Sequence, residues 1–289
     1  MIDHISESLS FFRDDLFPMF GGGNKARKMW SLHETIASGG FNALVTTGGI
    51  QSNHCRAVAL YAKKFGLDCT LVLHGKEQDF LNELGNAKII RSTSSRVLFC
   101  EPESISSNMD KAMQNFEKRG RKPFYIYGGG HILEAAKCYI ETVEKLAQEY
   151  VPDYIFVASG TGSTHAGILA GISKLNLPTK VIGISVGRPK AKAEPIVREF
   201  YLDLCRKYDI NSQNDNVFVE DAFLCGGYGK FNDEIWKIQN NSLTDYNVFL
   251  DTTYTAKTFH GMQEVIKRES MTGKILFWYT GGQFNYFAS

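Results

Sequence analysis

Short apolar, β-branched runs alternate with longer amphipathic stretches, and this alternation restricts the fold more than any other feature of the chain. The runs are ALVTT (43–47), CTLVL (69–73), VLFC (97–100), FYIY (124–127), YIFVA (154–158), KVIGISV (180–186) and KILFWYT (274–280). Helix-like segments such as THAGILAGISKLN separate them. Strands that alternate with helices are typical of parallel sheets covered by helices on both faces. The sequence therefore predicts an α/β fold.

Two such units are expected within the 289 residues, a length that suits two packed domains. Residues 30–135 contain four strand candidates of their own. A second βα series begins after Val151, where the proline of VPDY marks a break. Ligands of such folds collect beyond the carboxyl ends of the strands, so we expect the active site between the two α/β layers.

Charge and cysteine content exclude several classes of function. The 32 basic and 31 acidic side chains leave a net charge of +1, which favours neither nucleic acid nor an anionic membrane as partner. The six cysteines are scattered, with no CxxC pair and no metal-like cluster with histidine, as expected for buried thiols in a reducing compartment. The polar, acidic N-terminus does not resemble a targeting peptide, and no apolar run approaches the ~20 residues of a membrane span. We expect a cytoplasmic protein without a metal site.

Three of the predicted strands end in glycine-bearing turns: TTGGIQSNH (46–54), ASGTGSTHAG (158–167) and YTGGQF (279–284). The second turn combines glycines with hydroxyl side chains at the start of a helix, an arrangement that binds anions such as phosphate. It has neither the P-loop nor the dinucleotide pattern. The alternative is a capped helix start without a ligand.

Two other polar stretches each have two interpretations. In QSNH, Ser52 and Asn53 begin a helix, so capping explains one of them, and His54 is either reactive or a hydrogen-bonded structural histidine. In GGGNKARKMW (21–30), Lys25 and Lys28 follow a glycine run. They are either solvated lysines of a first helical turn or reactive amines.

Together these stretches resemble a known family. GGGNKARK, TGGIQSNH, SGTGSTHAG, DTTYTAKTFHGM and YTGG occur in the order and at about the spacing found in the pyridoxal-phosphate (PLP) enzymes that include D-cysteine desulfhydrase and 1-aminocyclopropane-1-carboxylate (ACC) deaminase. The resemblance runs from about residue 11 to residue 282. It implies fold type II, with PLP in the cleft between two doubly wound domains with parallel sheets, and a homodimer. We place the large domain at residues 1–28 plus 137–289 and the small one at residues 29–136.

The resemblance also implies roles for individual residues. Lys25 matches the lysine that bonds covalently to PLP, and Lys28 the second, non-covalent lysine. The cofactor phosphate is expected on the loop formed by Gly160, Thr161, Gly162, Ser163 and Thr164. Asn53 matches the residue that hydrogen-bonds the ring hydroxyl, and Ser52 its neighbour that contacts the substrate; His54 is expected beside the substrate as well.

Two tyrosines complete the implied site. Tyr254 matches the tyrosine that stacks on the pyridine ring. Tyr228 resembles a second active-site tyrosine, although a core or lid aromatic remains an alternative for it.

Thr255 and Thr280 distinguish the branches of the family. ACC deaminases carry glutamate and leucine at these positions, whereas a neutral hydroxyl near the pyridine nitrogen makes PLP a weaker electron sink. This favours expulsion of a leaving group from the β carbon, so the expected reaction is α,β-elimination from a small amino acid such as D-cysteine, with Lys25 as the base, giving a keto acid and ammonia. β-Substitution, a specialised biosynthetic step, ACC deamination and PLP binding without turnover stay open as alternatives.

Overall fold

The computed structural model describes residues 1–212 and 217–288, and these divide into two compact units. The large unit comprises Met1–Phe17 and Ala136–Gln283; the small unit comprises Pro18–Ala135 and the C-terminal segment from Phe284 onward. The sequence analysis assigns residues 18–28 and the C-terminal segment to the large domain instead. In the structure, residues 18–28 belong to the small unit because helix α1 (Gly23–Ser31) packs against α3 (Asn53–Phe65).

The large unit is built on a six-stranded sheet in the order β1-β2-β10-β7-β8-β9. All neighbouring strands are parallel except β1 and β2, which pair antiparallel. The strands are β1 (Ile2–His4), β2 (Leu9–Arg13), β7 (Tyr154–Ser159), β8 (Lys180–Ser185), β9 (Phe218–Glu220) and β10 (Ile275–Tyr279). The helices of this unit are η1 (Asp14–Leu16), α7 (Leu133–Glu149), α8 (Ser163–Lys174), α9 (Lys190–Lys207), α10 (Asp233–Tyr246) and α11 (Thr255–Arg268).

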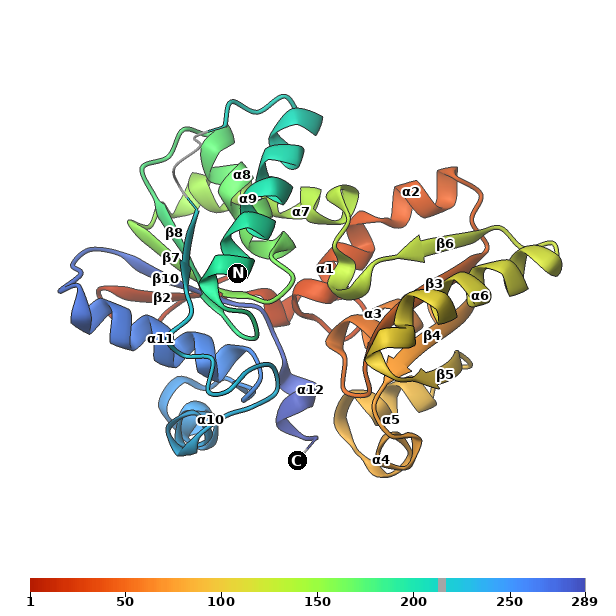
Figure 1. The fold of residues 1–289 in the computed structure, drawn as a ribbon. Coiled ribbons are helices and arrows are strands. Elements are labelled where there is room, and N and C mark those ends of the chain that lie inside the picture. Colours follow the sequence, from red (N-terminus) through yellow and green to blue (C-terminus); the bar gives the residue numbers. More distant parts are fainter. Residues whose placement is uncertain (213–216, 289) are drawn as a thin grey trace. The chain divides into compact units, whose positions relative to one another are not determined.

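Helices cover both faces of this sheet (Figure 1), with α8 and α9 on one side and α10 and α11 on the other. The packing of α7 on α8 depends on small residues, because a Cβ atom at Gly171 would lie 2.6 Å from Val143 Cβ. Under α11, Phe11, Phe259 and Phe277 pack edge to face at the centre of the core. The burial of β7, β8 and β10 explains their nearly continuous apolar sequences.

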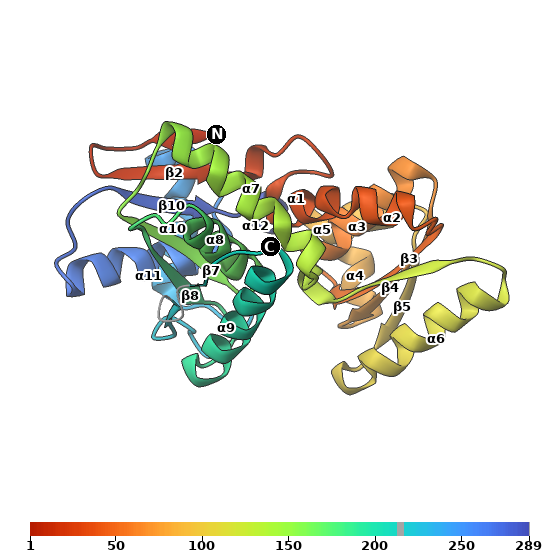
Figure 2. The ribbon, with the colours of Figure 1, turned by 90° about the horizontal axis from the view of Figure 1, so that it is seen from above.

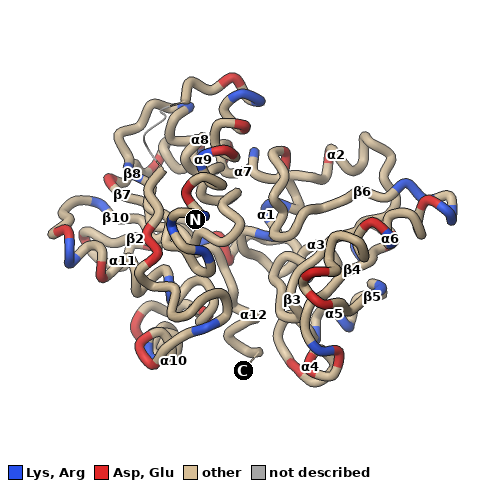
Figure 3. Tube along the Cα trace, in the orientation of Figure 1, with Lys and Arg blue, Asp and Glu red and all other residues tan. Residues whose placement is uncertain are grey.

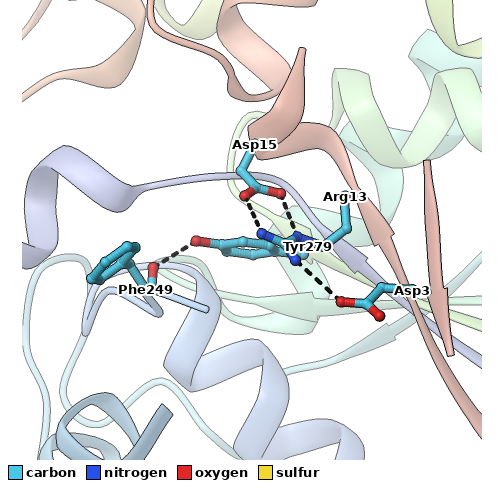
Figure 4. Close-up of polar contacts among 5 residues, drawn as sticks. All are labelled: Asp3, Arg13, Asp15, Phe249 and Tyr279. Atoms are coloured by element: carbon cyan, nitrogen blue, oxygen red, sulfur yellow. Dashed lines mark hydrogen bonds and ion pairs between the residues drawn. The ribbon is translucent and has the colours of Figure 1, made fainter. Parts of the chain in front are cut away.

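Polar contacts join the N-terminal strands to the end of β10 (Figure 4). Arg13 Nε and Nη2 donate to the two carboxylate oxygens of Asp15 at 2.9 and 2.8 Å, and Nη1 donates to Asp3 at 3.2 Å. The guanidinium carbon lies 5.7 Å from the ring centroid of Tyr279, whose hydroxyl donates to Phe249 O at 2.7 Å. Tyr279 is therefore fixed at both ends of its side chain, immediately before Thr280.

The small unit is built on a four-stranded, all-parallel sheet in the order β5-β4-β3-β6. Its strands are β3 (Ala43–Gly49), β4 (Asp68–His74), β5 (Arg96–Cys100) and β6 (Pro123–Ile126). Figure 2 shows α3 and α6 (Ile105–Lys118) on opposite faces of this sheet. The remaining helices are α2 (His33–Ser38), α4 (Glu77–Asn82), α5 (Gly85–Arg91), η2 (Pro102–Ser104), η3 (Gly128–Gly130) and α12 (Gln283–Tyr286), the last of which starts at the final residue of the large unit.

The predicted α/β class and its parallel sheets are confirmed, and each predicted strand matches an observed one. Strands β1, β2 and β9 were not predicted. The first and last are three residues long and lie at sheet edges, so they carry little periodic signal. β2 lies inside the sheet, where Phe11 and Phe12 are both buried because they point to opposite faces.

Two global features accompany this fold. Basic and acidic residues are interspersed along both units (Figure 3), as the balanced composition requires. Among the described helices, we find none that combines the length and the apolar character needed to cross a bilayer.

Candidate active site

Lys25 and Lys28 lie in the first two turns of α1 and share one acceptor in the small unit. Lys25 Nζ donates to Gly129 O at 2.9 Å, and Lys28 Nζ lies 3.5 Å from the same oxygen. Burial lowers the pKa of Lys25 to about 8, an effect that its hydrogen bond with Lys28 partly opposes. At pH 7, roughly one Lys25 side chain in ten is then unprotonated, which makes this amine a competent nucleophile.

The glycine run ahead of α1 allows the chain to enter the helix in this way. Gly21, Gly22 and Gly23 have φ values of +77°, +71° and +82°, in the region that favours glycine. A Cβ atom at Gly21 would lie 2.9 Å from Phe284 Cε2. The glycines of GGGNK are thus required by backbone conformation and, at Gly21, by close packing.

His54 is buried behind the two lysines, with 2% of its surface exposed. Thr46 Oγ1 donates to Ile126 O at 2.8 Å, so the same oxygen must accept the proton of His54 Nε2, also at 2.8 Å. This places the ring proton on Nε2 and leaves Nδ1 as an acceptor, buried and without a hydrogen-bond partner among the described residues. Burial and the charges of Lys25 and Lys28 hold the pKa of His54 well below its usual value. The imidazole is therefore neutral at physiological pH.

This burial bears on the expected role of His54 at the substrate. Gly130 lies against both Lys28 and His54, since a Cβ atom there would lie 3.3 Å from Lys28 Cδ and 3.7 Å from His54 Nδ1. The imidazole thus faces the lysine pair and η3. This environment suits an acceptor for a lysine better than a residue that contacts substrate.

Ser52 and Asn53 begin α3 and have different roles there. Ser52 is the N-cap, and its Oγ accepts from Cys55 N at 3.1 Å, which is the capping role that the sequence allows for one of the pair. Asn53 is 9% exposed, and its Oδ1 accepts from Asn86 Nδ2 at 2.9 Å and from Arg56 Nη1 at 3.3 Å. The amide of Asn53 is therefore held in one orientation.

In the large unit, the loop from Gly160 to Thr164 leads from β7 into α8. Gly162 is the N-cap of α8 and supplies no capping side chain, so the first-turn N–H groups of this long helix are directed toward the loop. Gly162 has φ +89°, and a Cβ atom there would lie 2.9 Å from Val197 Cγ2. Arg188 adds a cation to the loop, because its Nη1 donates to Gly160 O at 2.5 Å. These features form an anion cradle in which the backbone is the main ligand.

The hydroxyl groups of Thr255 and Thr280 differ in their hydrogen bonds. Thr255 Oγ1 accepts from Asp251 N at 2.7 Å and donates to Asp251 Oδ1 at 2.8 Å, so its proton is committed. Asp251 Oδ2 accepts from the N–H groups of Thr253 and Tyr254, each at 3.1 Å, which fixes the turn that carries Tyr254. Thr280 is buried, and its hydroxyl makes no hydrogen bond to another described residue.

Tyr228 and Tyr254 are paired through their hydroxyl groups, with ring centroids 5.8 Å apart at an angle of 74°. Tyr228 is 54% exposed, so it is not a core residue. Lys257 holds its loop, since the buried Nζ donates to Leu224 O at 2.9 Å and to Gly227 O at 2.8 Å. Tyr254 also borders the anion cradle, because a Cβ atom at Gly160 would lie 3.9 Å from Tyr254 Cε1.

The predicted residues thus form one set in each unit. The small unit groups Lys25, Lys28 and His54 and places Ser52 and Asn53 at the start of the same helix as His54. The large unit groups the loop 160–164 with Tyr254 and, through Tyr254, with Tyr228 and Thr255. The sequence analysis missed the residues that support these sets, which are Arg56, Asn86, Arg188, Asp251 and Lys257. Only Arg56 had a local signal, three residues after Asn53 on one helix face.

Comparison with known proteins identifies relatives over nearly the whole chain. A family model described as pyridoxal-phosphate dependent enzyme matches residues 4–281. A Pyrococcus horikoshii relative, whose name places it with the 1-aminocyclopropane-1-carboxylate deaminases, is 33% identical over 93% of this chain and 83% of its own. A D-cysteine desulfhydrase of Klebsiella pneumoniae is 30% identical over 97% of this chain and 88% of its own. The crystal structure of an ACC deaminase homologue has a TM-score of 0.89 at 31% identity, over 96% of this chain and 86% of that one.

Proposed function

The chain belongs to the pyridoxal-phosphate dependent enzymes, and from this premise we propose that it catalyses α,β-elimination from a small D-amino acid such as D-cysteine. The products are a keto acid, ammonia and the released β substituent. The observation that carries the proposal is the Lys25 amine, whose acceptor Gly129 O holds it beside Lys28 and whose burial brings its pKa to about 8.

The residues present suit the cofactor group by group. An aldehyde requires an amine that loses its proton easily, and Lys25 meets this requirement. A phosphate requires backbone N–H groups at a helix start, and the Gly162 cap of α8 leaves these without a side-chain cap. A ring hydroxyl requires a directed donor. The acceptor oxygen of Asn53 already receives hydrogen bonds within the small unit, so its Nδ2 group is the one offered to the hydroxyl. When bound, pyridoxal phosphate supplies an electron sink for the reacting carbon.

In this proposal Lys25 also moves the α-proton of the substrate. Its Nζ is held by Gly129 O, and Lys28 provides a second ammonium group against the same carbonyl. A lysine with a lowered pKa is suited both to accept a proton and to return it. Ser52 keeps its helix-capping bond and orients the first turn of α3, where the substrate carboxylate is expected.

The hydrogen bonds of the two threonines support elimination over ACC deamination. The hydroxyl of Thr255 donates its hydrogen bond to Asp251. Thr280 therefore provides the hydroxyl that is free to face the pyridine nitrogen. A neutral hydroxyl does not hold a proton on that nitrogen as a carboxylate does. The weaker sink suits rapid loss of a good leaving group, and a relative of similar identity carries the name D-cysteine desulfhydrase.

The test is to supply the purified protein with pyridoxal phosphate and then with D-cysteine, L-cysteine or ACC, measuring keto acid, sulfide and ammonia. The proposal expects sulfide and pyruvate in equal amounts from D-cysteine, and neither product from the Lys25→Ala variant. Keto acid from ACC without sulfide from D-cysteine would overturn it. Turnover of D-cysteine that requires a second nucleophile would establish β-substitution instead. Sedimentation velocity tests the homodimer, which remains a prediction.

A further inference from the structure

Arg56 is a cation in the interior of the small unit, with 1% of its surface exposed. It lies on α3, three residues after Asn53, and its hydrogen bonds go to uncharged oxygens. Nη2 donates to Gly22 O at 2.9 Å, and Nη1 lies 3.3 Å from both Asn53 Oδ1 and Asn86 Oδ1. Burying a guanidinium carries a large desolvation cost, so this position calls for a function that an apolar residue cannot supply.

The chemistry of arginine fixes the direction of this hydrogen-bond network. A guanidinium only donates, so the atoms of Asn53 and Asn86 that face it must be their carbonyl oxygens. Asn86 then presents Nδ2 to the remaining partners and donates to Asn53 Oδ1 at 2.9 Å and to Gln51 O at 3.1 Å. Asn53 Oδ1 thus receives two donors, and its Nδ2 is directed away from the network. Without Arg56, Asn86 is still oriented by the Gln51 carbonyl, but Asn53 Oδ1 loses one of the two donors that fix its amide.

The C-terminal segment covers this network. The ring of Phe284 lies over the guanidinium, with its centroid 4.8 Å from the carbon of that group. Asn285 Oδ1 accepts from Asn86 Nδ2, and this hydrogen bond also stabilises the orientation of the Asn86 amide. The segment approaches α5 closely, because a Cβ atom at Gly85 would lie 2.3 Å from Phe284 O. Arg56 and Asn86 are thus almost completely shielded from solvent, with 1% and 0% of their surfaces exposed.

We propose that Arg56 is a positioning residue that, together with Asn86, holds the amide of Asn53 as a hydrogen-bond donor to the ring hydroxyl of the cofactor. This inference rests on the proposed function, in which Asn53 contacts that hydroxyl. Arg56 itself does not touch cofactor or substrate. It disfavours the flipped orientation of the Asn53 amide, in which Oδ1 would face the ring hydroxyl oxygen of the cofactor in place of the Nδ2 donor.

The test compares the affinity of the apoprotein for pyridoxal phosphate and for 3-deoxypyridoxal 5′-phosphate, which lacks the ring hydroxyl. Both probes can bond to Lys25 and to the phosphate loop, and the internal effect of the hydroxyl on the aldehyde is the same in every variant. The change in affinity ratio between wild type and variant therefore isolates the contact of the hydroxyl with the protein. One hydrogen bond to a charged oxygen corresponds to a ratio of about 10 or more for the wild type. We expect Arg56→Met to reduce this ratio severalfold relative to the wild type, with the affinity for the deoxy probe largely kept.

Asn86→Asp is the second variant, for the case that Arg56→Met fails to fold. It keeps Arg56 and gives this cation a carboxylate partner. It also replaces the Asn86 amide that donates to Asn53 Oδ1 with an oxygen that can only accept, so the present orientation of Asn53 loses one donor and faces a repelling oxygen. It too should lose the discrimination between the probes. Arg91→Met, an exposed arginine of the same unit, should keep the ratio.

The outcomes are distinguishable. Folded Arg56→Met and Asn86→Asp proteins that keep the wild-type ratio would overturn the inference. A wild type that binds both probes equally would overturn it as well, since no donor to the hydroxyl would then exist. A wild type that binds neither probe would instead sink the proposed function.

Discussion

His54 Nε2 donates to Thr46 Oγ1 at 2.8 Å, and because Thr46 donates its own proton to a strand carbonyl, this contact determines the tautomer of a buried histidine next to two lysines. The side chain of a strand residue thereby sets which nitrogen of His54 carries the proton. Nδ1 is left as a buried acceptor, and the charges of Lys25 and Lys28 help to hold the pKa of the imidazole well below its usual value.

Thr46→Val should destabilise the protein and release this tautomer. The valine leaves Nε2–H of His54 buried without a partner, which costs about 1–3 kcal/mol, and it removes the hydroxyl donor from the Ile126 carbonyl. Urea denaturation measures the loss, and ¹⁵N chemical shifts of the imidazole report the tautomer. The control is Thr47→Val at the next position, whose hydroxyl donates to Val72 O at 2.8 Å but has no histidine partner. An unchanged imidazole spectrum in Thr46→Val would contradict this interpretation.

Lys25→Met should stabilise the apoprotein at neutral pH and lose this advantage in alkali. The pKa of Lys25 falls from its ordinary 10.5 in the unfolded chain to about 8 in the folded protein. The unfolded state thus binds more protons between these values, and wild-type stability rises as the pH increases through that window. Burying the charge of Lys25 costs at most about 3 kcal/mol, and less because the side chain keeps some exposure. This cost applies in full below pH 8.

The measurement is a set of denaturant melts of both proteins from pH 7 to 10.5. The difference in their free energies of unfolding should shrink steadily over that range. Lys63→Met, which removes an exposed lysine of the same unit, accounts for the general effect of losing a surface charge. A difference that is constant or grows with pH would show that Lys25 is not held at a lowered pKa.

Gly162→Ala should weaken both the fold and the anion cradle. An alanine at φ +89° is strained by about 1–2 kcal/mol, and its Cβ would lie 2.9 Å from Val197 Cγ2, so α8 has to shift. Affinity for pyridoxal phosphate should fall at least tenfold, as measured by equilibrium dialysis. Gly120→Ala is the matched control, because Gly120 has φ +71° and open space around it. It should show the strain alone, with cofactor affinity unchanged.

Lys257→Met should release the loop that carries Tyr228. The methionine removes the ammonium donor from the carbonyls of Leu224 and Gly227, each of which keeps only one backbone N–H donor from within the loop. Hydrogen exchange over residues 224–230 should accelerate by about tenfold or more, corresponding to a local loss of ~1–3 kcal/mol. Lys267→Met, on the exposed side of the same helix, should leave that exchange unchanged. Equal exchange in both variants would mean that Lys257 does not hold the loop.

The strands and the chemically reactive positions were predictable because each has a local signature. Continuous β-branched runs identify parallel strands such as β7, and GGGNK or SGTGST combines glycines with polar groups within a few residues. The supporting residues carry no such signature. Asn86 reaches Asn53 from a different helix, and Arg188 reaches Gly160 from the end of another strand. Their roles follow from tertiary packing, which a single sequence does not encode in any short window.

The discontinuity of the small unit has a consequence for synthesis. Residues 18–135 leave the ribosome early, but Phe284 and Asn285, which cover Arg56 and bond Asn86, are made only after the strands and helices of residues 136–283. Until then the guanidinium has access to water, and the amides of Asn53 and Asn86 are not sealed. The order of translation therefore makes the Asn53 network one of the last parts of the small unit to become rigid.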